Sequence, residues 1–133
     1  LATALIQVKE IMAKANKIPI VAANVTMERA IKEMSNKKLG IVCVKEKNGK
    51  INLITDGDVR RNSNNLYKKK ISKIYNRNPN WISDTTTALS ALEKMNTLKI
   101  TSLLVARKKD IKKKIKKLIG VLHLHHCLSK GIK

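Results

Sequence analysis

Two short polar clusters, each following an apolar run, hold the residues of this chain that could do chemistry. The first is Thr55-Asp56-Gly57-Asp58, which comes directly after Ile51–Ile54. A hydroxyl at the end of a strand and the amides that open the next helix point to one place, which suits a phosphate. Thr55 and Asp56 could equally serve only to cap that helix. The spacing alone fits both an anion site and a cap.

The second cluster holds all three histidines of the chain, His123, His125 and His126. In a strand, residues 123 and 125 share one face and residue 126 points to the other. Cys127 is adjacent rather than convergent and no fourth ligand stands at a useful spacing, so we expect no metal site. We interpret the histidines as polar residues at a strand–helix junction. A pH-sensitive anion site is the alternative, because histidine gains charge near neutral pH.

An internal repeat supplies the elements that position both clusters. Thr26–Met34 returns 61 residues later as Thr87–Met95, and Ile41–Val44 returns at the same offset as Ser102–Val105. Apolar residues recur at helical spacing in both copies, as Met27, Ala30, Ile31 and Met34 and then as Ala88, Ala91, Leu92 and Met95. A period this long marks two copies of one supersecondary unit. We expect the stacked copies to share a cleft that binds a ligand.

Each copy is predicted to run strand, helix, strand, strand, helix, with an N-terminal helix over Leu1–Met12 before the first. The predicted strands are Ile18–Val21, Gly40–Val44, Ile51–Thr55, Trp81–Ile82, Thr101–Ala106 and Leu118–Leu122. The predicted helices are Thr26–Asn36, one from Asp56 onward, Thr86–Thr97 and Leu124–Ser129. Pro19 restricts the first strand to a sheet edge, and Asn48-Gly49 suits a hairpin turn.

The two copies differ in the loop of their hairpin. In the second copy this loop is longer, spans Arg107–Lys117 and is rich in lysine. We interpret this loop as a solvated protrusion rather than a binding arm. As domains, we predict residues 1–63 with the N-terminal helix, a linker over residues 64–70, and residues 71–133. At 43% hydrophobic, 133 residues can fill a compact core.

Charge and composition narrow the classes of function. The chain has 29 lysine and arginine residues against 9 acidic ones, a net charge of +20, which predicts an anionic partner. Aromatics make up only 2% of the chain, which disfavours nucleic acid, while a nucleotide phosphate fits the charge. No run approaches a membrane span. Cys43 and Cys127 are expected to be buried thiols in a reducing cytoplasm.

The tandem unit, with its third strand ending in Thr55-Asp56-Gly57-Asp58, resembles a pair of cystathionine-β-synthase-type (CBS) domains. This implies an α+β fold of two β-α-β-β-α repeats. Leu53–Arg61 in the first copy, with Lys99–Val105 and Gly120–His125 in the second, is similar to the C-terminal regulatory half of the arabinose-5-phosphate isomerases. The resemblance covers nearly the whole chain.

That resemblance implies a sugar-isomerase (SIS) catalytic domain upstream in a longer chain. Such a parent would interconvert D-ribulose 5-phosphate and D-arabinose 5-phosphate for Kdo and lipopolysaccharide synthesis. This chain begins with Leu1 and carries no Gly/Ser-rich phosphate loop and no acid–base set. We therefore expect it to hold no catalytic residue and to be the regulatory part of a cytoplasmic homo-oligomer, with its own SIS domain as partner and no membrane partner.

In CBS pairs that bind adenine nucleotides, a Thr/Ser-x-x-Asp element holds phosphate and ribose, and the resemblance carries this role to Thr55 and Asp58. It also implies that Ile18, Ile20 and Ile41 hold the base. The expected ligand is a small anionic nucleotide, with an adenine or cytidine nucleotide as effector.

In the second copy, His123 stands at the position of Thr55, and His126 at that of Asp58. A histidine does not reproduce a carboxylate that accepts hydrogen bonds from two ribose hydroxyls. The second copy is therefore expected either to lack a site or to take a different anion.

Two alternatives stay open beside this interpretation. The first is a stand-alone CBS protein that senses a nucleotide without a catalytic partner, which the coding sequence upstream of Leu1 would decide. The second is a basic nucleic-acid-binding module, which predicts tight and steeply salt-dependent binding to unrelated oligonucleotides.

Overall fold

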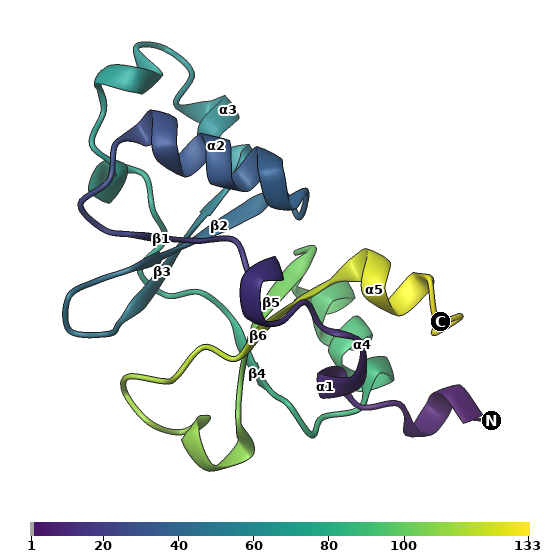
Figure 1. Cartoon of the computed structure of the whole chain (residues 1–133). Helices are drawn as coiled ribbons and strands as arrows, with labels where there is room; N and C mark the ends of the chain where they lie inside the picture. The colour runs from purple at the N-terminus through teal and green to yellow at the C-terminus, as the bar shows by residue number, and fades with distance from the viewer. Residues whose placement is uncertain (1) are drawn as a thin grey trace. The chain divides into compact units, whose positions relative to one another are not determined.

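In the computed structural model, which describes residues 2–133, both repeats take the predicted strand–helix–strand–strand–helix order (Figure 1). Each repeat contributes one three-stranded sheet. The predicted α+β class, with two β-α-β-β-α repeats, is confirmed. Within the described part of the chain, no helix is both long enough and apolar enough to cross a bilayer.

The chain divides into two compact units that cut across the sequence repeats. The central unit is Asn16–Pro79, and the terminal unit joins the segment ending at Ala15 to Asn80–Lys133. The N-terminal segment therefore belongs with the elements of the second repeat, and residues 64–79 belong with those of the first. The packing boundaries therefore fall about 15 residues away from the predicted boundaries at both junctions.

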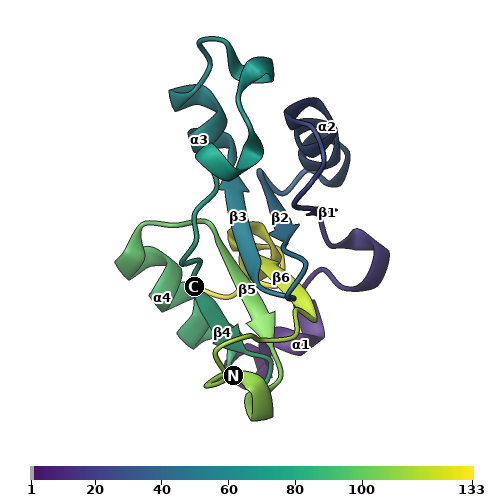
Figure 2. The ribbon, with the colours of Figure 1, turned by 90° about the vertical axis from the view of Figure 1, so that its left-hand side faces the viewer.

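The central unit holds β1 (Ile20–Ala22), α2 (Met27–Lys37), β2 (Ile41–Lys45), β3 (Ile51–Thr55) and α3 (Asp56–Arg61), followed by the short 3₁₀ helices η3 (Leu66–Lys68) and η4 (Ile71–Lys73). β1 pairs in parallel with β2, and β2 pairs antiparallel with β3. Figure 2 shows β1 at the outer side of β2, the edge position that Pro19 predicts. Thr26 caps α2 by accepting a hydrogen bond from the amide of Arg29 at 3.2 Å.

One face of this sheet forms the core of the central unit with α2. Met27, Ala30 and Met34 of α2 pack with Val42, Val44 and Ile54 of the strands. Ile71 and Ile74 complete this cluster, and the neighbouring Asn76 pairs with Leu53 along β3. Since side chains alternate along a strand, Ile20, Ile41 and Thr55 face the other side of the sheet.

The terminal unit holds η1 (Ala2–Leu5), α1 (Val8–Ile11), β4 (Trp81–Ser83), α4 (Ala88–Leu98), β5 (Ser102–Ala106), η5 (Lys108–Asp110), β6 (Gly120–His123) and α5 (Leu124–Leu128). Its sheet repeats the pairing of the first, with β4 parallel to β5 and β5 antiparallel to β6. β6 begins at Gly120 rather than at the predicted Leu118. Cys127 and Cys43 are both free and buried, as predicted.

The prediction of one continuous helix over Leu1–Met12 is wrong, and Leu1 itself lies outside the described residues. The segment instead forms η1 and α1, separated by a break at Ile6 and Gln7. The break occurs because the backbone bonds elsewhere: the amide of Ala88 donates to the carbonyl of Ile6 at 2.8 Å, and Gln7 forms a β-bridge with Thr87. Tertiary hydrogen bonds here override helical periodicity.

Beyond α1 the chain adds to the edge of β6. Ala13 and Val121 exchange two backbone hydrogen bonds of 2.9 and 3.0 Å. This close approach requires a glycine at the start of β6, because a Cβ on Gly120 would collide with the side chain of Met12. The N-terminal segment is thus tied to the second repeat by a local strand pairing.

Candidate ligand site

Thr55 and Asp58 form a reciprocal capping box at the start of α3. The Thr55 hydroxyl accepts from the amide of Asp58 at 3.1 Å, and the Thr55 amide donates to Oδ2 of Asp58 at 2.9 Å. Oδ1 of Asp58 also pairs with Arg61 at 2.6 Å. The cap interpretation is therefore right for Thr55, but its partner is Asp58. The side chain of Asp56 is instead 64% exposed and lies 3.7 Å from Arg60.

The apolar residues predicted for the same site lie on the face of the sheet that carries Thr55. Ile41 is directly opposite Thr55 in the β2–β3 ladder, and Ile20 is level with Cys43 on β2. Ile18, two residues before Ile20, is buried at the end of the sheet where α3 begins. The structure therefore brings Ile41, Thr55 and Asp58 together, with Ile18 at the same end of the sheet.

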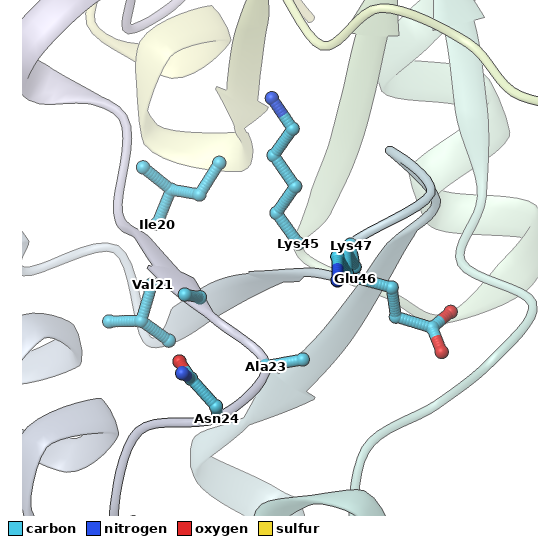
Figure 3. A pocket seen from close by; sticks show the side chains of 8 residues that line it. Ile20, Val21, Ala23, Asn24, Lys45, Glu46 and Lys47 are labelled. Carbon is cyan, nitrogen blue, oxygen red and sulfur yellow. The ribbon is translucent and has the colours of Figure 1, made fainter.

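A pocket of about 540 Å³ opens at the other end of β1 and β2 (Figure 3). Its lining residues are Ile20, Val21, Ala22, Ala23, Asn24, Lys45, Glu46 and Lys47. Ile20 is the one predicted site residue among them. In Figure 3 the side chains of Ile20 and Lys45 rise to the same side of the sheet, and the Glu46 carboxylate points away from them. An apolar wall with a lysine at its rim can receive a flat, anionic molecule.

Sequence reasoning missed these other pocket residues. The predicted strand ends at Val44 and the predicted turn is centred on Asn48-Gly49, so neither Lys45 nor Lys47 is given a role in binding. The weak signal is the Lys45-Glu46-Lys47 run, which places two cations where β2 ends. Only the pairing of Ala22 with Lys45 shows that this run lies beside the end of β1.

Glu33 of α2 holds the edge strand that lines the pocket. Its Oε2 accepts from the backbone amide of Ile20 at 3.4 Å and from Lys37 at 3.0 Å, and Oε1 lies 3.5 Å from Arg29. Burial of Glu33 by itself raises its pKa, but hydrogen bonds from Lys37, the Ile20 amide and Arg29 outweigh that effect and lower it. The ionised carboxylate thus fixes β1 in place without reaching the pocket.

In the second repeat, His123 and His126 form a capping box of the same geometry. The amide of His123 donates to Nδ1 of His126 at 2.9 Å, and the amide of His125 donates to Nδ1 of His123 at 3.0 Å. A ring nitrogen that accepts a hydrogen bond carries no proton, so the neutral rings hold their proton on Nε2. Burial lowers the pKa of His126, and the adjacent His125 lowers it further.

Ser102, which lies opposite His123, is polar and buried. Ser102 pairs with His123 across β5 and β6, and it is the counterpart of Ile41 in the first repeat. Among residues 2–133, no hydrogen-bond partner is recorded for its hydroxyl. Over the same residues, no group of three His, Cys, Asp or Glu side chains is arranged to hold a metal ion. The second repeat thus has two imidazole rings and a serine hydroxyl where the first has a threonine hydroxyl, a carboxylate and an isoleucine side chain.

The model of the CBS domain family matches residues 8–65. The chain is 41% identical over 105 residues to arabinose 5-phosphate isomerase KdsD of Francisella tularensis, covering 76% of this chain and 32% of that protein. It is 30% identical over 132 residues to KdsD of Yersinia pestis, covering 96% of this chain and 38% of that protein. The chain therefore spans less than two fifths of the length of these relatives.

Solved structures share the fold. The CBS domain pair of protein MJ0100, in complex with 5′-methylthioadenosine and S-adenosyl-L-methionine, has a TM-score of 0.79 at 18% identity and covers 96% of each chain. CBSX2 in complex with AMP has a TM-score of 0.78 at 19% identity, covering 95% of this chain and 96% of that one. With the repeat, the sheet topology and the match of residues 8–65 to the CBS domain model, these likenesses show that this chain folds as a CBS domain pair.

Proposed function

We propose that this chain is the nucleotide-sensing, oligomerising CBS pair of a longer cytoplasmic arabinose-5-phosphate isomerase. The parent's SIS domain would interconvert D-ribulose 5-phosphate and D-arabinose 5-phosphate for Kdo and lipopolysaccharide synthesis. The KdsD relatives support this proposal, because the chain matches about a third of their length. The AMP and adenosyl ligands of the CBS neighbours support an adenine-type effector. Effector binding would shift the populations of conformations available to the catalytic domain.

The main structural support for nucleotide binding is the geometry of the Asp58 side chain. Its Oδ2 accepts one hydrogen bond from the Thr55 amide, and its Oδ1 accepts one from Arg61. Each carboxylate oxygen has two lone pairs, so each keeps one that could accept from a ribose hydroxyl. The side chain of Arg61 is 69% exposed, and its charge would favour a phosphate beside the ribose.

The volume of the pocket beside Ile20 falls in the range of small-molecule sites. Ile20 and Ile41 lie on the same face of the sheet as Thr55, so a base held along this face would lie between apolar side chains. We propose that Ile18, Ile20 and Ile41 contribute that apolar surface, and that Thr55 and Asp58 contribute the polar contacts. In the second repeat, we propose that His123 and His126 line the corresponding site, where Nε2 of His126 would donate to an anion.

A thermal-shift panel of AMP, ADP, ATP, CMP and CMP-Kdo on this chain tests the proposal. A ligand present at 100 times its dissociation constant adds about 2.7 kcal/mol to the unfolding free energy. That should raise the melting temperature by several degrees in a domain of this size. A shift with one compound would support a nucleotide effector and name its class. No shift with any compound would contradict nucleotide sensing and leave an oligomerisation role.

The parent activity needs a separate test on the longer chain. The expected result is that the full-length protein interconverts the two pentose phosphates, and that the compound found in the panel changes its rate. Light scattering of the same preparation should give the mass of a homo-oligomer. A full-length protein without isomerase activity would favour a stand-alone nucleotide sensor.

A further inference from the structure

The hairpin loop of residues 107–117, here called the basic loop, concentrates charge far beyond the rest of the chain. It holds eight of the 29 lysine and arginine residues, while the other 122 residues hold 21. A general preference for lysine would be spread along the sequence, so it does not account for this local density. The loop contains a single acidic residue, Asp110.

The structure fixes this loop to the terminal unit. Asp110 is buried and pairs with Lys113 at 2.7 Å, and the amide of Lys108 donates to Oδ1 of Asp84 at 3.1 Å. Lys116 donates to the carbonyl of Lys113 at 2.7 Å and lies 5.7 Å from the centre of the Trp81 ring. The sequence alone suggests a solvated protrusion, but these contacts hold the backbone in one arrangement. A surface that is already ordered loses less entropy when it binds.

Only two of the eight cations of the basic loop, Lys113 and Lys116, make the contacts described above. Asp110 neutralises Lys113, and Lys116 is directed at the loop and at Trp81. The remaining cations are exposed, namely Arg107, Lys108, Lys109, Lys112, Lys114 and Lys117. Ile115 stands among them with 42% of its surface exposed. The ordered loop therefore presents a group of lysines around one exposed aliphatic side chain (the lime-green loop below β4 in Figure 1).

Although the sequence analysis expects no membrane partner, we propose that the basic loop docks this protein onto an anionic lipid surface. Lysines near such a surface are attracted by its negative potential, and an exposed aliphatic side chain can enter the boundary between head groups and acyl chains. Nucleic acid is the less suitable partner, because single strands are held by stacking on aromatic rings and the ring of Trp81 lies beside Lys116. The loop also has only one arginine, the side chain that best grips phosphates and bases in a fixed geometry.

The test is cosedimentation of this chain with vesicles of phosphatidylcholine, with and without about 30 mol% phosphatidylglycerol, at about 0.1 M salt. We expect binding only to the anionic vesicles. The variant Lys109→Gln/Lys112→Gln/Lys114→Gln should lower the partition coefficient at least about tenfold, since each lysine near the surface contributes roughly fivefold. The control Lys68→Gln/Lys70→Gln/Lys73→Gln removes the same charge from exposed sites of the central unit and should change binding by about twofold or less.

A second variant tests the apolar contact. Ile115→Ser keeps every charge and should lower binding to anionic vesicles severalfold, and circular dichroism should show unchanged melting. The proposal fails if both lysine triples weaken binding equally, because net charge alone would then be responsible. It also fails if neutral vesicles bind as well as anionic ones. A loop-dependent preference for unrelated oligonucleotides over vesicles at the same salt would instead assign the loop to nucleic acid.

Discussion

In the central unit the residue that closes the capping box of α3 is Asp58, while in the terminal unit the same position, before α5, is His126. Both side chains accept a hydrogen bond of 2.9 Å from the first residue of their box. The aspartate accepts through a carboxylate oxygen. The histidine accepts only while its Nδ1 is unprotonated. The two caps therefore place an acceptor at the same position, but the acceptor is a carboxylate in one repeat and an imidazole nitrogen in the other.

The side chains that anchor the two edge strands differ in hydrogen-bond polarity. Glu33 accepts from the backbone amide of Ile20 on β1, while Lys94, 61 residues later, donates to the carbonyl of Trp81 on β4 at 2.8 Å. Each helix thus holds its edge strand from the same position with a side chain of opposite charge. The repeat preserves the location of each hydrogen bond and leaves its polarity free, so the two copies offer ligands different electrostatic surroundings.

The largest expected effect on stability comes from a residue near the start of the third strand of each repeat. This residue is Gly120 in β6 and Asn52 in β3. Gly120→Ala places a Cβ against Met12 and 3.0 Å from the carbonyl oxygen of Ala13. We expect a loss of about 1–3 kcal/mol in the free energy of unfolding, as for an overpacked core. Urea denaturation measures it. Gly57→Ala is the control, because the atoms nearest its Cβ include the flexible ends of Arg60 and Arg61. Equal losses in both variants would show that the strand pairing with Ala13 is not responsible.

Removing the carboxylate of the first cap tests whether the nucleotide binds at the first repeat. Asp58→Ala is expected to weaken nucleotide binding at least about tenfold, or about 1.4 kcal/mol. Loss of the cap should also lower the free energy of unfolding by about 1 kcal/mol while leaving the fold intact. Calorimetry with the compound identified in the panel gives the affinity. Asp56→Ala removes an equal charge from the same helix without touching the box. Unchanged affinity in Asp58→Ala would refute the proposed position of the ribose.

The two strand anchors should differ in strength. Glu33→Ala leaves the amide of Ile20 without its carboxylate partner and removes the partner of Lys37, so we expect a loss of about 1–2 kcal/mol. Lys94→Ala removes one hydrogen bond to a carbonyl and should cost about 0.5–1 kcal/mol. Thermal unfolding of both variants measures the difference. A larger loss in Lys94→Ala would mean that the two anchors do not have the roles assigned to them.

The smallest expected effect is a pH dependence carried by the second cap. In the unfolded chain His126 takes up a proton near its ordinary pKa of 6.5, whereas the folded state resists protonation until a lower pH. The unfolded state then binds more protons, so the free energy of unfolding falls as pH drops below 6.5. Between pH 7.5 and about 5.5 we expect a loss of about 1 kcal/mol or less.

The variant His126→Asp should reduce this pH dependence, because a carboxylate stays ionised and accepts the His123 amide over the whole range. His125→Gln is the comparison: it keeps the backbone hydrogen bonds of the box and removes only the smaller, electrostatic contribution of His125 to the lowered pKa of His126, so most of the slope should remain. Urea denaturation at each pH gives the free energies. A slope that persists unchanged in His126→Asp would place the titrating group elsewhere.

Much of this structure follows from local sequence patterns. The predicted strand Ile51–Thr55 has the observed bounds, and the helices beginning at Asp56 and Leu124 start where predicted. Thr26, the first residue of the predicted helix, is its N-cap, so the helix begins one residue later at Met27. Such features depend on residues close together in the chain, where cap chemistry and apolar spacing act directly.

The sequence by itself determined the repeat, the order of the elements and the edge position of β1, because residue types and their spacing along the chain are enough to predict them. Only the tertiary structure decided that the first twelve residues break their helical pattern and that Lys45 stands beside the end of β1. It also showed the basic loop bound to the terminal unit through Asp84. The physical reason is the same in each case: these hydrogen bonds and contacts join residues distant in sequence, and no local spacing records such partners.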